Sequence, residues 1–227
     1  MIEIPYTPKK PDTIRLLFTR IAGSYDLTNH VISLGLDVRW RRKFARKFQD
    51  RQRIADICCG TGALLPILGR RILAGLDFTH AMLRVAAQRH PVSRLVEGDA
   101  QHIPFATSTF DGAAIIYSIR NIPDIPQALR ELNRILQPGG ILGILDFGTP
   151  KGRILEFLYR IYFQRIMPFL GSFVAGDRAS YHYFVNSVLN FPKREAFLQM
   201  MRDAGFSGCR YEEYTLGAAL VYLGEKT

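Results

Sequence analysis

The chain is poor in cysteine and has no long uninterrupted apolar run. Three cysteines occur among 227 residues. Cys58 and Cys59 are neighbours and Cys209 is distant in sequence, so a disulfide framework and a cysteine metal site are both excluded. The most apolar segment, residues 154–176, is interrupted by charged residues and a proline, which makes it a poor membrane span. The start of the sequence lacks a signal-peptide pattern, so we expect a cytoplasmic protein that binds no metal.

The glycine motif near residue 60 lacks two features of better-known nucleotide sites. Residues 54–62 read I-A-D-I-C-C-G-T-G, and a dinucleotide fingerprint would need a third glycine where the chain has Leu65. No lysine follows the glycines, which excludes a phosphate-binding P-loop. Asp56 precedes Gly60, and Asp77 closes the next apolar run, where a carboxylate can accept both hydroxyls of a ribose. This acid-rich pattern predicts a cationic nucleoside ligand, S-adenosylmethionine; the alternative is a glycine turn that serves packing alone.

Positive charge is concentrated before this motif. The net charge is +10, and residues 1–53 hold twelve Lys and Arg against five Asp and Glu. A helix is predicted over residues 37–48, with Asp37 as its N-cap and Trp40, Phe44 and Phe48 along one face. Such a helix suits an anionic membrane surface or a nucleic-acid backbone. The alternative is that the aromatic stripe packs on the core while the charges are solvated.

Apolar runs alternate with helical spacing along the rest of the chain. Helices are expected over residues 79–89 and 125–136, the latter ended by Gln137, Pro138, Gly139 and Gly140. Strands are expected before Gly60, up to Asp77, and over residues 94–96, 110–117, 141–147, 210–214 and 218–223. This rhythm predicts an α/β fold with a doubly wound, mostly parallel, seven-stranded sheet.

Polar residues cluster where these strands end. Asp56, Asp77 and Asp99 follow the first three strands, and Arg120 and Asn121 follow the fourth, next to Ser118. Ligands of doubly wound sheets gather at the carboxyl ends of the strands. We expect the three acids to face the amino acid, the ribose and the base of the ligand in that order, with the backbone of Ala100 near a ring nitrogen.

Several motifs resemble one family. D-I-C-C-G-T-G, G-L-D-F-T-H-A-M-L, E-G-D-A-Q-H-I-P-F and R-E-L-N-R-I-L-Q-P-G-G look like the motifs of class I S-adenosylmethionine-dependent methyltransferases. Two flanking blocks, F-T-R-I-A-G-S-Y-D-L-T-N-H-V-I-S-L-G and A-G-D-R-A-S-Y-H-Y-F-V-N-S-V, are similar to those of the menaquinone and ubiquinone biosynthesis C-methyltransferases. The resemblance runs from about residue 18 to residue 226.

The resemblance implies a Rossmann-like methyltransferase fold with N-terminal helices and a helical lid after the fifth strand. We expect one domain over residues 1–227, divided into an N-terminal segment (1–52), a cofactor-binding core (53–150), the lid (151–190) and a C-terminal segment (191–227). The implied cofactor is S-adenosylmethionine, with S-adenosylhomocysteine as product. Its predicted ligands are Asp56, Gly60, Thr61, Gly62, Asp77, Phe78, Met82, Asp99, Ala100, Ile116 and Tyr117.

The implied reaction is methylation of a ring carbon of a polyprenylated demethylquinol. A neighbouring hydroxyl must lose its proton to activate that carbon, so the site needs a base and donors for the phenolate. The predicted catalytic residues are Tyr25, Arg120, Asn121, Asp177 and Tyr181. For Arg120 the alternative is a structural ion pair, and His182 is either a base or simply packed.

Partners follow from the same interpretation. Residues 154–176 are expected to line a channel for the isoprenoid tail and to contact an anionic membrane surface; the alternative is a helix buried against the sheet or in a homodimer. A nucleic-acid methyltransferase would need a target-base loop where the chain reads S-I-R-N-I-P, so no nucleic-acid partner is expected. Another lipid or aromatic acceptor and a non-catalytic binding protein remain alternatives.

Overall fold

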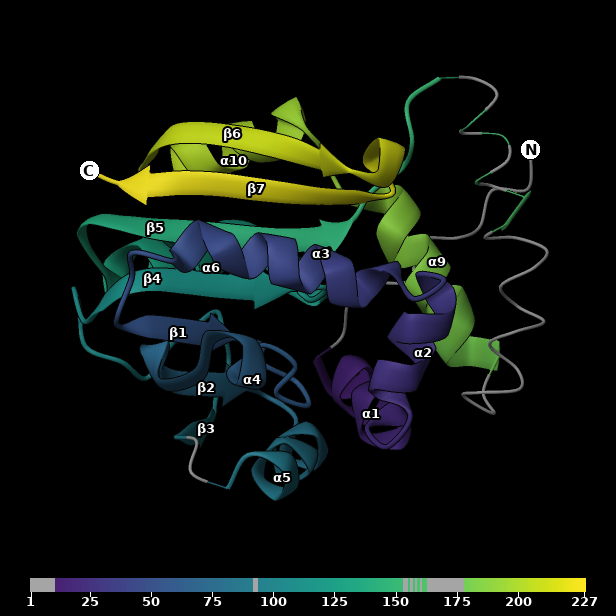
Figure 1. The fold of residues 1–227 in the computed structure, drawn as a ribbon, viewed down its shortest axis with the longest axis horizontal. Coiled ribbons are helices and arrows are strands. Elements are labelled where there is room, and N and C mark those ends of the chain that lie inside the picture. The colour runs from purple at the N-terminus through teal and green to yellow at the C-terminus, as the bar shows by residue number, and fades with distance from the viewer. Residues whose placement is uncertain are drawn as a thin grey trace.

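A seven-stranded sheet forms the centre of the protein (Figure 1). The computed structural model describes residues 11–91, 94–152, 155, 157, 159, 161–162 and 178–227. The strands are β1 (Ile54–Ile57), β2 (Ile72–Asp77), β3 (Leu95–Glu97), β4 (Phe110–Ile116), β5 (Leu136–Phe147), β6 (Phe206–Tyr214) and β7 (Ala219–Lys226). Their order across the sheet is β3-β2-β1-β4-β5-β7-β6. The mostly parallel, doubly wound sheet predicted from the sequence is therefore confirmed.

The strand order reverses next to β1. The chain runs outward from β1 through β2 to β3, then returns to place β4 on the other side of β1. Strands β1 to β5 are parallel, and β7 is antiparallel to both β5 and β6. The carboxyl ends of β1 and β4 thus flank the switch point, where open α/β sheets bind ligands.

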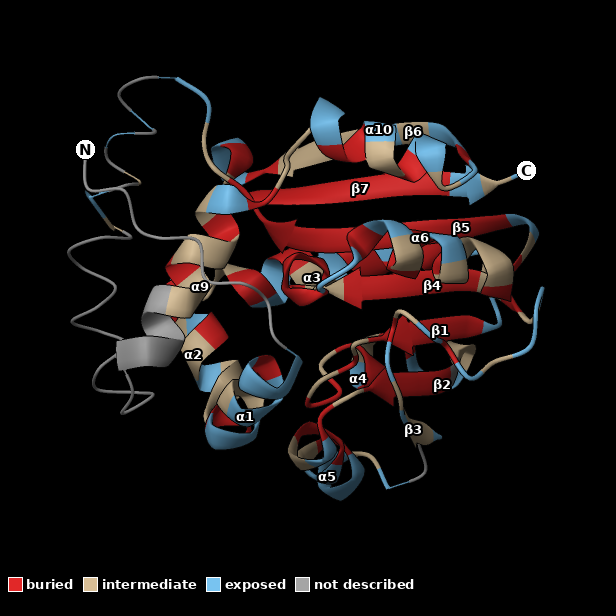
Figure 2. Cartoon of the chain, turned by 180° about the vertical axis from the view of Figure 1, so that it is seen from behind, coloured by how far each residue is buried: buried red, intermediate tan, exposed pale blue. Residues whose placement is uncertain are grey.

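Helices cover both faces and the carboxyl end of the sheet. They are α1 (Pro11–Ile21), α2 (Tyr25–Ile32), α3 (Leu36–Ala45), α4 (Leu65–Leu68), α5 (His80–Arg89), α6 (Ile125–Ile135), α9 (Arg178–Asn190) and α10 (Glu195–Asp203), with short 3-10 turns η1 (Arg46–Phe48), η2 (Gly69–Arg71), η3 (Ile119–Asn121) and η5 (Thr215–Gly217). In Figure 1, α3 lies on the near face, whereas Figure 2 shows α6 and α10 on the opposite face. The helices α1, α2 and α9 gather at the carboxyl end of the parallel strands.

The aromatic stripe of the N-terminal segment packs on the sheet. Trp40, Phe44 and Phe48 are all buried in one cluster against β5 and β7. Gly143 leaves room for this packing, since a Cβ there would lie 2.7 Å from the Phe48 ring. The interpretation that the stripe belongs to the core is confirmed. The exposed charges of α3 include Arg39, Arg42 and Lys43.

Some predicted boundaries were wrong. α3 begins at Leu36 with Gly35 as its N-cap at φ +78°, so Asp37 lies inside the helix and is buried rather than capping it. β5 begins at Leu136, which pairs with Phe110 of β4, five residues earlier than expected. Half of the predicted lid, including residues 163–177, lies outside the described residues.

Candidate active site

The turn after β1 is built from left-handed residues. Cys58, Gly60 and Gly62 have φ values of +56°, +55° and +81°. A Cβ on Gly62 would lie 2.7 Å from Leu65, so this glycine allows the turn to pack on the following helix, whereas a Cβ on Gly60 would meet only the Tyr25 ring at 3.9 Å. Gly60 therefore leaves open space beside Tyr25 in which a ligand can approach the backbone.

The tip of β4 is strained in the same way. Tyr117 directly follows β4 and has a φ of +56°, although it is not a glycine. Cys58 holds the equivalent position after β1, and the two strands are neighbours. Backbone strain of this kind gathers at functional sites. It marks the switch point of the sheet as the candidate site.

Asp77 fixes the glycine turn to the second strand. Its two carboxylate oxygens accept hydrogen bonds from the backbone amides of Gly60 and Thr79, each at 2.9 Å. Burial raises the pKa of Asp77 to about 6, and the two amide donors oppose that rise. Each oxygen retains a lone pair, so the carboxylate can still accept ligand hydroxyls.

Asp56 is a buried carboxyl without a partner. Its side chain is fully enclosed, and neither oxygen has a hydrogen-bond partner within the part of the chain that the structure describes. Burial, followed by the nearby charge of Asp77, raises the pKa of Asp56 to about 8. An unpaired carboxyl of this kind is destabilising in the charged form, so a cation bound nearby would relieve that cost.

An open cavity of about 630 Å³ lies between α1, the glycine turn and the tips of β2 and β3; we call it the outer cavity. It is lined by Pro11, Ile14, Phe18, Tyr25, Cys58, Gly60, Asp77, Phe78, Thr79, Met82, Gly98, Asp99, Ala100, Gln101, Ser118, Asn121, Ile122 and Pro123. Among these described residues the charged ones are Asp77 and Asp99, so the outer cavity suits a cationic ligand.

A second cavity of about 320 Å³ continues behind the glycine turn, and we call it the inner cavity. It is lined by Tyr25, Asp26, Asn29, Arg41, Cys58, Cys59, Gly60, Thr61, Ala63, Ile116 and Tyr117. Tyr25, Cys58 and Gly60 line both cavities. The structure thus brings the predicted cofactor residues together in two adjoining spaces; Asp56 and Gly62 lie beneath them and line neither.

Arg120 forms a buried ion pair. Its Nη1 pairs with Asp146 and donates to the carbonyl of Tyr117 at 2.7 Å, while Nε donates to Ser187 Oγ at 3.2 Å. The guanidinium also lies 5.0 Å from the Phe184 ring centre. The structural ion pair considered for Arg120 is therefore present, and Arg120 lines neither cavity.

Asn121 reaches the outer cavity. It is buried in η3, and its Oδ1 accepts a hydrogen bond from the Tyr183 hydroxyl at 3.2 Å. This contact directs the amide Nδ2, a donor, to other partners. Tyr183 was not predicted as a site residue, although it lies in the same aromatic segment as the predicted Tyr181.

Tyr25 lies at the junction of the two cavities. Burial raises its pKa, and the positive charge of Arg120 opposes that rise. Its phenol therefore stays protonated near neutral pH and can donate a hydrogen bond. Asp177 lies outside the described residues; Tyr181 belongs to α9, but its side chain is also outside them, as is that of His182.

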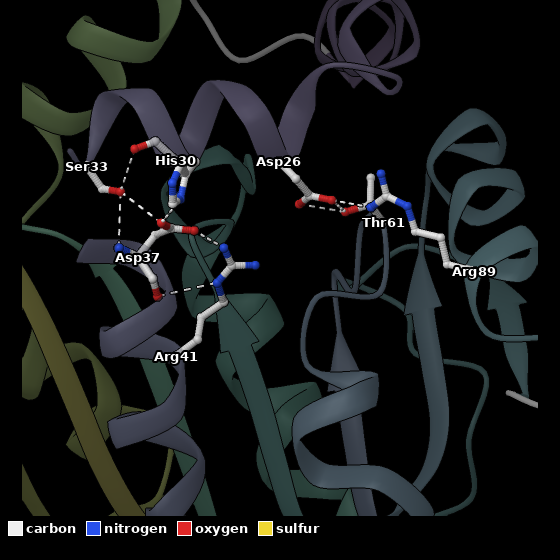
Figure 3. A network of polar contacts seen from close by, with 7 residues as sticks. All are labelled: Asp26, His30, Ser33, Asp37, Arg41, Thr61 and Arg89. Carbon is white, nitrogen blue, oxygen red and sulfur yellow. Dashed lines mark hydrogen bonds and ion pairs between the residues drawn. The ribbon is translucent and has the colours of Figure 1, made fainter. Parts of the chain in front are cut away.

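The N-terminal helix α2 is attached directly to the glycine turn. The carboxylate of Asp26 accepts the Thr61 hydroxyl at 2.9 Å and forms an ion pair with Arg89 of α5 (Figure 3). Sequence reasoning missed Asp26, Asn29 and Arg41, since their approach to the site depends on how α2 and α3 pack. The signal available was their place in the flanking Tyr-Asp block and in the basic helix.

The strand order is that of the class I methyltransferase fold, and two acids, Asp77 and Asp99, line the outer cavity near the switch point. The sequence profile of the ubiE/COQ5 methyltransferase family matches residues 7–226. The chain belongs to this family.

Similar proteins carry consistent names. A demethylmenaquinone methyltransferase of Thermus thermophilus is 39% identical, with 92% of this chain and 100% of the relative aligned. One from Deinococcus radiodurans is 37% identical over 96% and 94% of the two chains. A ubiquinone/menaquinone biosynthesis C-methyltransferase UbiE of Geobacter sulfurreducens is 34% identical over 96% and 90%.

Solved structures show the same fold. A possible histamine N-methyltransferase from Thermotoga maritima, described as an S-adenosylmethionine-dependent methyltransferase, superposes with a TM-score of 0.71 over 94% of this chain and 100% of that one, at 21% identity. A phosphoethanolamine methyltransferase of Haemonchus contortus in complex with S-adenosylhomocysteine gives 0.56 over 77% and 48%, at 17% identity. The protein is therefore an S-adenosylmethionine-dependent methyltransferase by family, and it shares the fold of these structures.

Two kinds of feature are missing from the part of the chain that the structure describes. None of its helices combines the length and apolar character needed to cross a membrane. Its His, Cys, Asp and Glu side chains form no group of three or more that could hold a metal ion.

Proposed function

We propose that this protein transfers a methyl group from S-adenosylmethionine to a ring carbon of a polyprenylated demethylquinol, with demethylmenaquinol as the first candidate acceptor. One observation carries the proposal: family membership across residues 7–226 coincides with an outer cavity whose charged described residues, Asp77 and Asp99, are both acids. The names of the similar proteins support the choice of acceptor.

The cofactor residues fit the parts of S-adenosylmethionine. Asp77 would accept the ribose hydroxyls, Asp99 and the backbone of Ala100 would meet the adenine, and Met82 and Phe78 supply apolar surface. The unpartnered Asp56 would face the ammonium group from beneath the turn. When bound, the cofactor supplies an electrophilic methyl group on a sulfonium.

On the acceptor side, the chain must stabilise a developing phenolate. Asn121 Nδ2 and the Tyr25 hydroxyl are donors at the wall of the outer cavity, and both would stabilise an oxyanion placed between them. Arg120 would act indirectly. Its ion pair with Asp146 fixes η3, the turn that also carries Asn121. Its positive charge also lowers the pKa of Tyr25 against the effect of burial.

Labelled methyl transfer tests the proposal. Purified protein is incubated with methyl-labelled S-adenosylmethionine and separate acceptors: a demethylmenaquinol, a demethylated benzoquinol, a phospholipid and tRNA. We expect label in the demethylmenaquinol product. Label in tRNA or phospholipid alone, or in no acceptor, would overturn the proposal.

We further propose that one surface contacts an anionic membrane, where such an acceptor resides. Leu34 and Leu216 are each 70% exposed at the tips of two turns. The first turn leads into α3, and the second lies beside α3, since Trp40 Nε1 of that helix donates to Thr215 Oγ1 at 2.9 Å. The same helix carries the exposed basic residues Arg39, Arg42 and Lys43. Apolar tips flanked by arginines suit the boundary between headgroups and acyl chains.

Vesicle flotation tests this surface. We expect salt-sensitive binding to vesicles that contain anionic lipid, reduced by the double substitution Leu34→Ser and Leu216→Ser. The matched control is Leu16→Ser, another exposed leucine, which lies on α1. Equal binding by all three proteins would refute the assigned surface.

The remaining partner predictions concern the lid and assembly. We propose that residues 154–176 line the path of the isoprenoid tail, that the protein forms a homodimer and that it binds no nucleic acid. Light scattering after size exclusion measures the molar mass in solution. The mass of a monomer would contradict the proposed homodimer. A shift of tRNA by the protein in a gel-shift experiment would contradict the proposal that it binds no nucleic acid.

A further inference from the structure

We infer that Arg41 binds the carboxylate of the amino-acid end of S-adenosylmethionine in the inner cavity. The inference rests on the proposed use of that cofactor and assigns a role to a residue outside its predicted ligand set. S-adenosylmethionine carries a single anionic group, its carboxylate, so a site that holds the whole molecule needs one cation for that group.

Arg41 is placed to supply this cation. Among the described residues, it is the only lysine or arginine that lines either cavity, and it shares the inner cavity with Gly60 and Thr61 of the glycine turn. Its side chain is 12% exposed. A guanidinium so shielded from water binds a carboxylate more strongly than one at the surface.

The cavities also set the direction of the ligand. Asp77 and Asp99, which suit the ribose and the base, line the outer cavity and not the inner one. A nucleoside bound there would direct its amino-acid chain past Gly60, where the two cavities meet and where the turn leaves open space. The far end of that chain, the carboxylate, would then reach the side of Arg41.

The guanidinium of Arg41 is held by Asp37 but keeps hydrogen-bond donors for a ligand. Its Nη2 pairs with the carboxylate of Asp37, and its Nε donates to the Asp37 carbonyl at 3.4 Å (Figure 3). Asp37 is in turn held by Ser33 Oγ at 3.1 Å and by His30 Nδ1 at 3.0 Å. Within the described part of the chain, Nη1 of Arg41 has no hydrogen-bond partner, so one edge of the fork is available.

The Tyr117 hydroxyl is a second hydrogen-bonding group in the inner cavity. It is buried and has no hydrogen-bond partner among the described residues, and Tyr117 lines the inner cavity together with Arg41. The positive charge of Arg41 opposes the rise that burial causes in the pKa of this tyrosine. A carboxylate between them would accept from both.

The other charged residue of the inner cavity does not compete for this role. Asp26 is already bound by the Thr61 hydroxyl and by Arg89. Figure 3 shows its carboxylate directed from α2 toward Thr61 and Arg89. Arg89 does not line either cavity, which leaves Arg41 to meet an incoming anion.

Calorimetry with two ligands that differ in the carboxylate alone tests the inference. S-adenosylmethionine and decarboxylated S-adenosylmethionine are titrated into the full chain, so the readout is binding and needs no acceptor. We expect the wild-type protein to prefer S-adenosylmethionine by about 10- to 100-fold, as for a charge-assisted hydrogen bond. In Arg41→Gln, which keeps a donor for Asp37, the preference should fall to near one, while binding of the decarboxylated ligand is unchanged.

The matched control is Arg42→Gln, an exposed neighbour on α3 that should retain the full preference. If Arg41→Gln does not fold, the double substitution Arg41→Gln and Asp37→Asn removes both charges of the pair and is expected to give the same loss. A preference that survives in the folded variant, or equal weakening of both ligands, would overturn the inference. If the wild-type protein binds neither ligand, the proposed function itself fails instead.

Discussion

Two buried arginine–aspartate pairs flank the site, and they differ in what they leave free. Arg120 is enclosed with Asp146 between aromatic rings, and it donates to a carbonyl and a hydroxyl as well. Arg41 pairs with Asp37 through Nη2 and Nε, and it also lines the inner cavity. The first pair holds a strand tip in place, whereas the second can still bind a ligand. An arginine at a strand tip is therefore not necessarily free to bind a ligand.

The largest effect on stability is expected at the Arg120 pair. Arg120→Met would leave Asp146 buried and unpaired, which lowers the free energy of unfolding by about 3–5 kcal/mol. Adding Asp146→Leu should recover most of that loss. Urea unfolding measures both, with Arg41→Gln as the comparison, where the loss should be near 1 kcal/mol because Ser33 and His30 still contact Asp37. Equal losses for Arg120→Met and Arg41→Gln would remove the contrast between the pairs.

Cofactor affinity should depend on Asp77 more than on Arg120. Asp77→Ala removes the acceptor for the ribose and should weaken S-adenosylmethionine about 100-fold, with turnover at saturating cofactor largely kept. Arg120→Ala should reduce turnover far more than affinity, since it lines neither cavity. Calorimetry measures the cofactor affinity of each variant, and steady-state kinetics measures its turnover. If each variant lost both properties equally, the roles would be wrongly assigned.

Asp56 should make stability depend on pH. Its pKa is raised from 3.8 in the unfolded chain to about 8 in the folded protein, so the folded state holds a proton that the unfolded state has lost. Stability is then greatest below pH 3.8 for this group and falls as the pH rises to about 8, by at most about 1.4 kcal/mol per pH unit. Asp56→Asn should flatten this part of the curve. An unchanged slope in urea unfolding between pH 5 and 8 would contradict the expectation.

The smallest effect concerns the support of Arg41. Ser33→Ala removes one donor to Asp37 and should reduce the preference for S-adenosylmethionine over its decarboxylated form by about threefold. Thr19→Ala, an exposed hydroxyl on α1, is the control. A loss as large as that of Arg41→Gln would show that the Asp37 network, rather than the guanidinium, selects the carboxylate.

The sequence was informative where the signal is local. The strands β1 and β2, the helices α5 and α6 and the acids that follow the strands could all be predicted, because apolar periodicity and glycine turns depend on neighbours in sequence. The family motifs added Thr61, Ile116 and Tyr117, which the structure places around one cavity.

Features that depend on tertiary packing could not be predicted. Asp37 looked like an N-cap, but the N-cap is Gly35, two residues earlier and in the left-handed region, so Asp37 lies inside the helix and is buried. Arg41 looked like one of many solvated charges in a basic helix; only the packing of α3 beside the glycine turn distinguishes it from the exposed Arg42. Likewise, the partner of Arg120 lies 26 residues away on β5.

The central claim is that the protein forms a carbon–carbon bond between the methyl group and a quinol ring. The most direct measurement is NMR of the product formed from demethylmenaquinol and S-adenosylmethionine carrying a ¹³C-methyl group. We predict a labelled methyl group bonded to a ring carbon and formation of S-adenosylhomocysteine in equal amount. A labelled methoxy group, or S-adenosylhomocysteine formed without labelled quinol, would contradict the account.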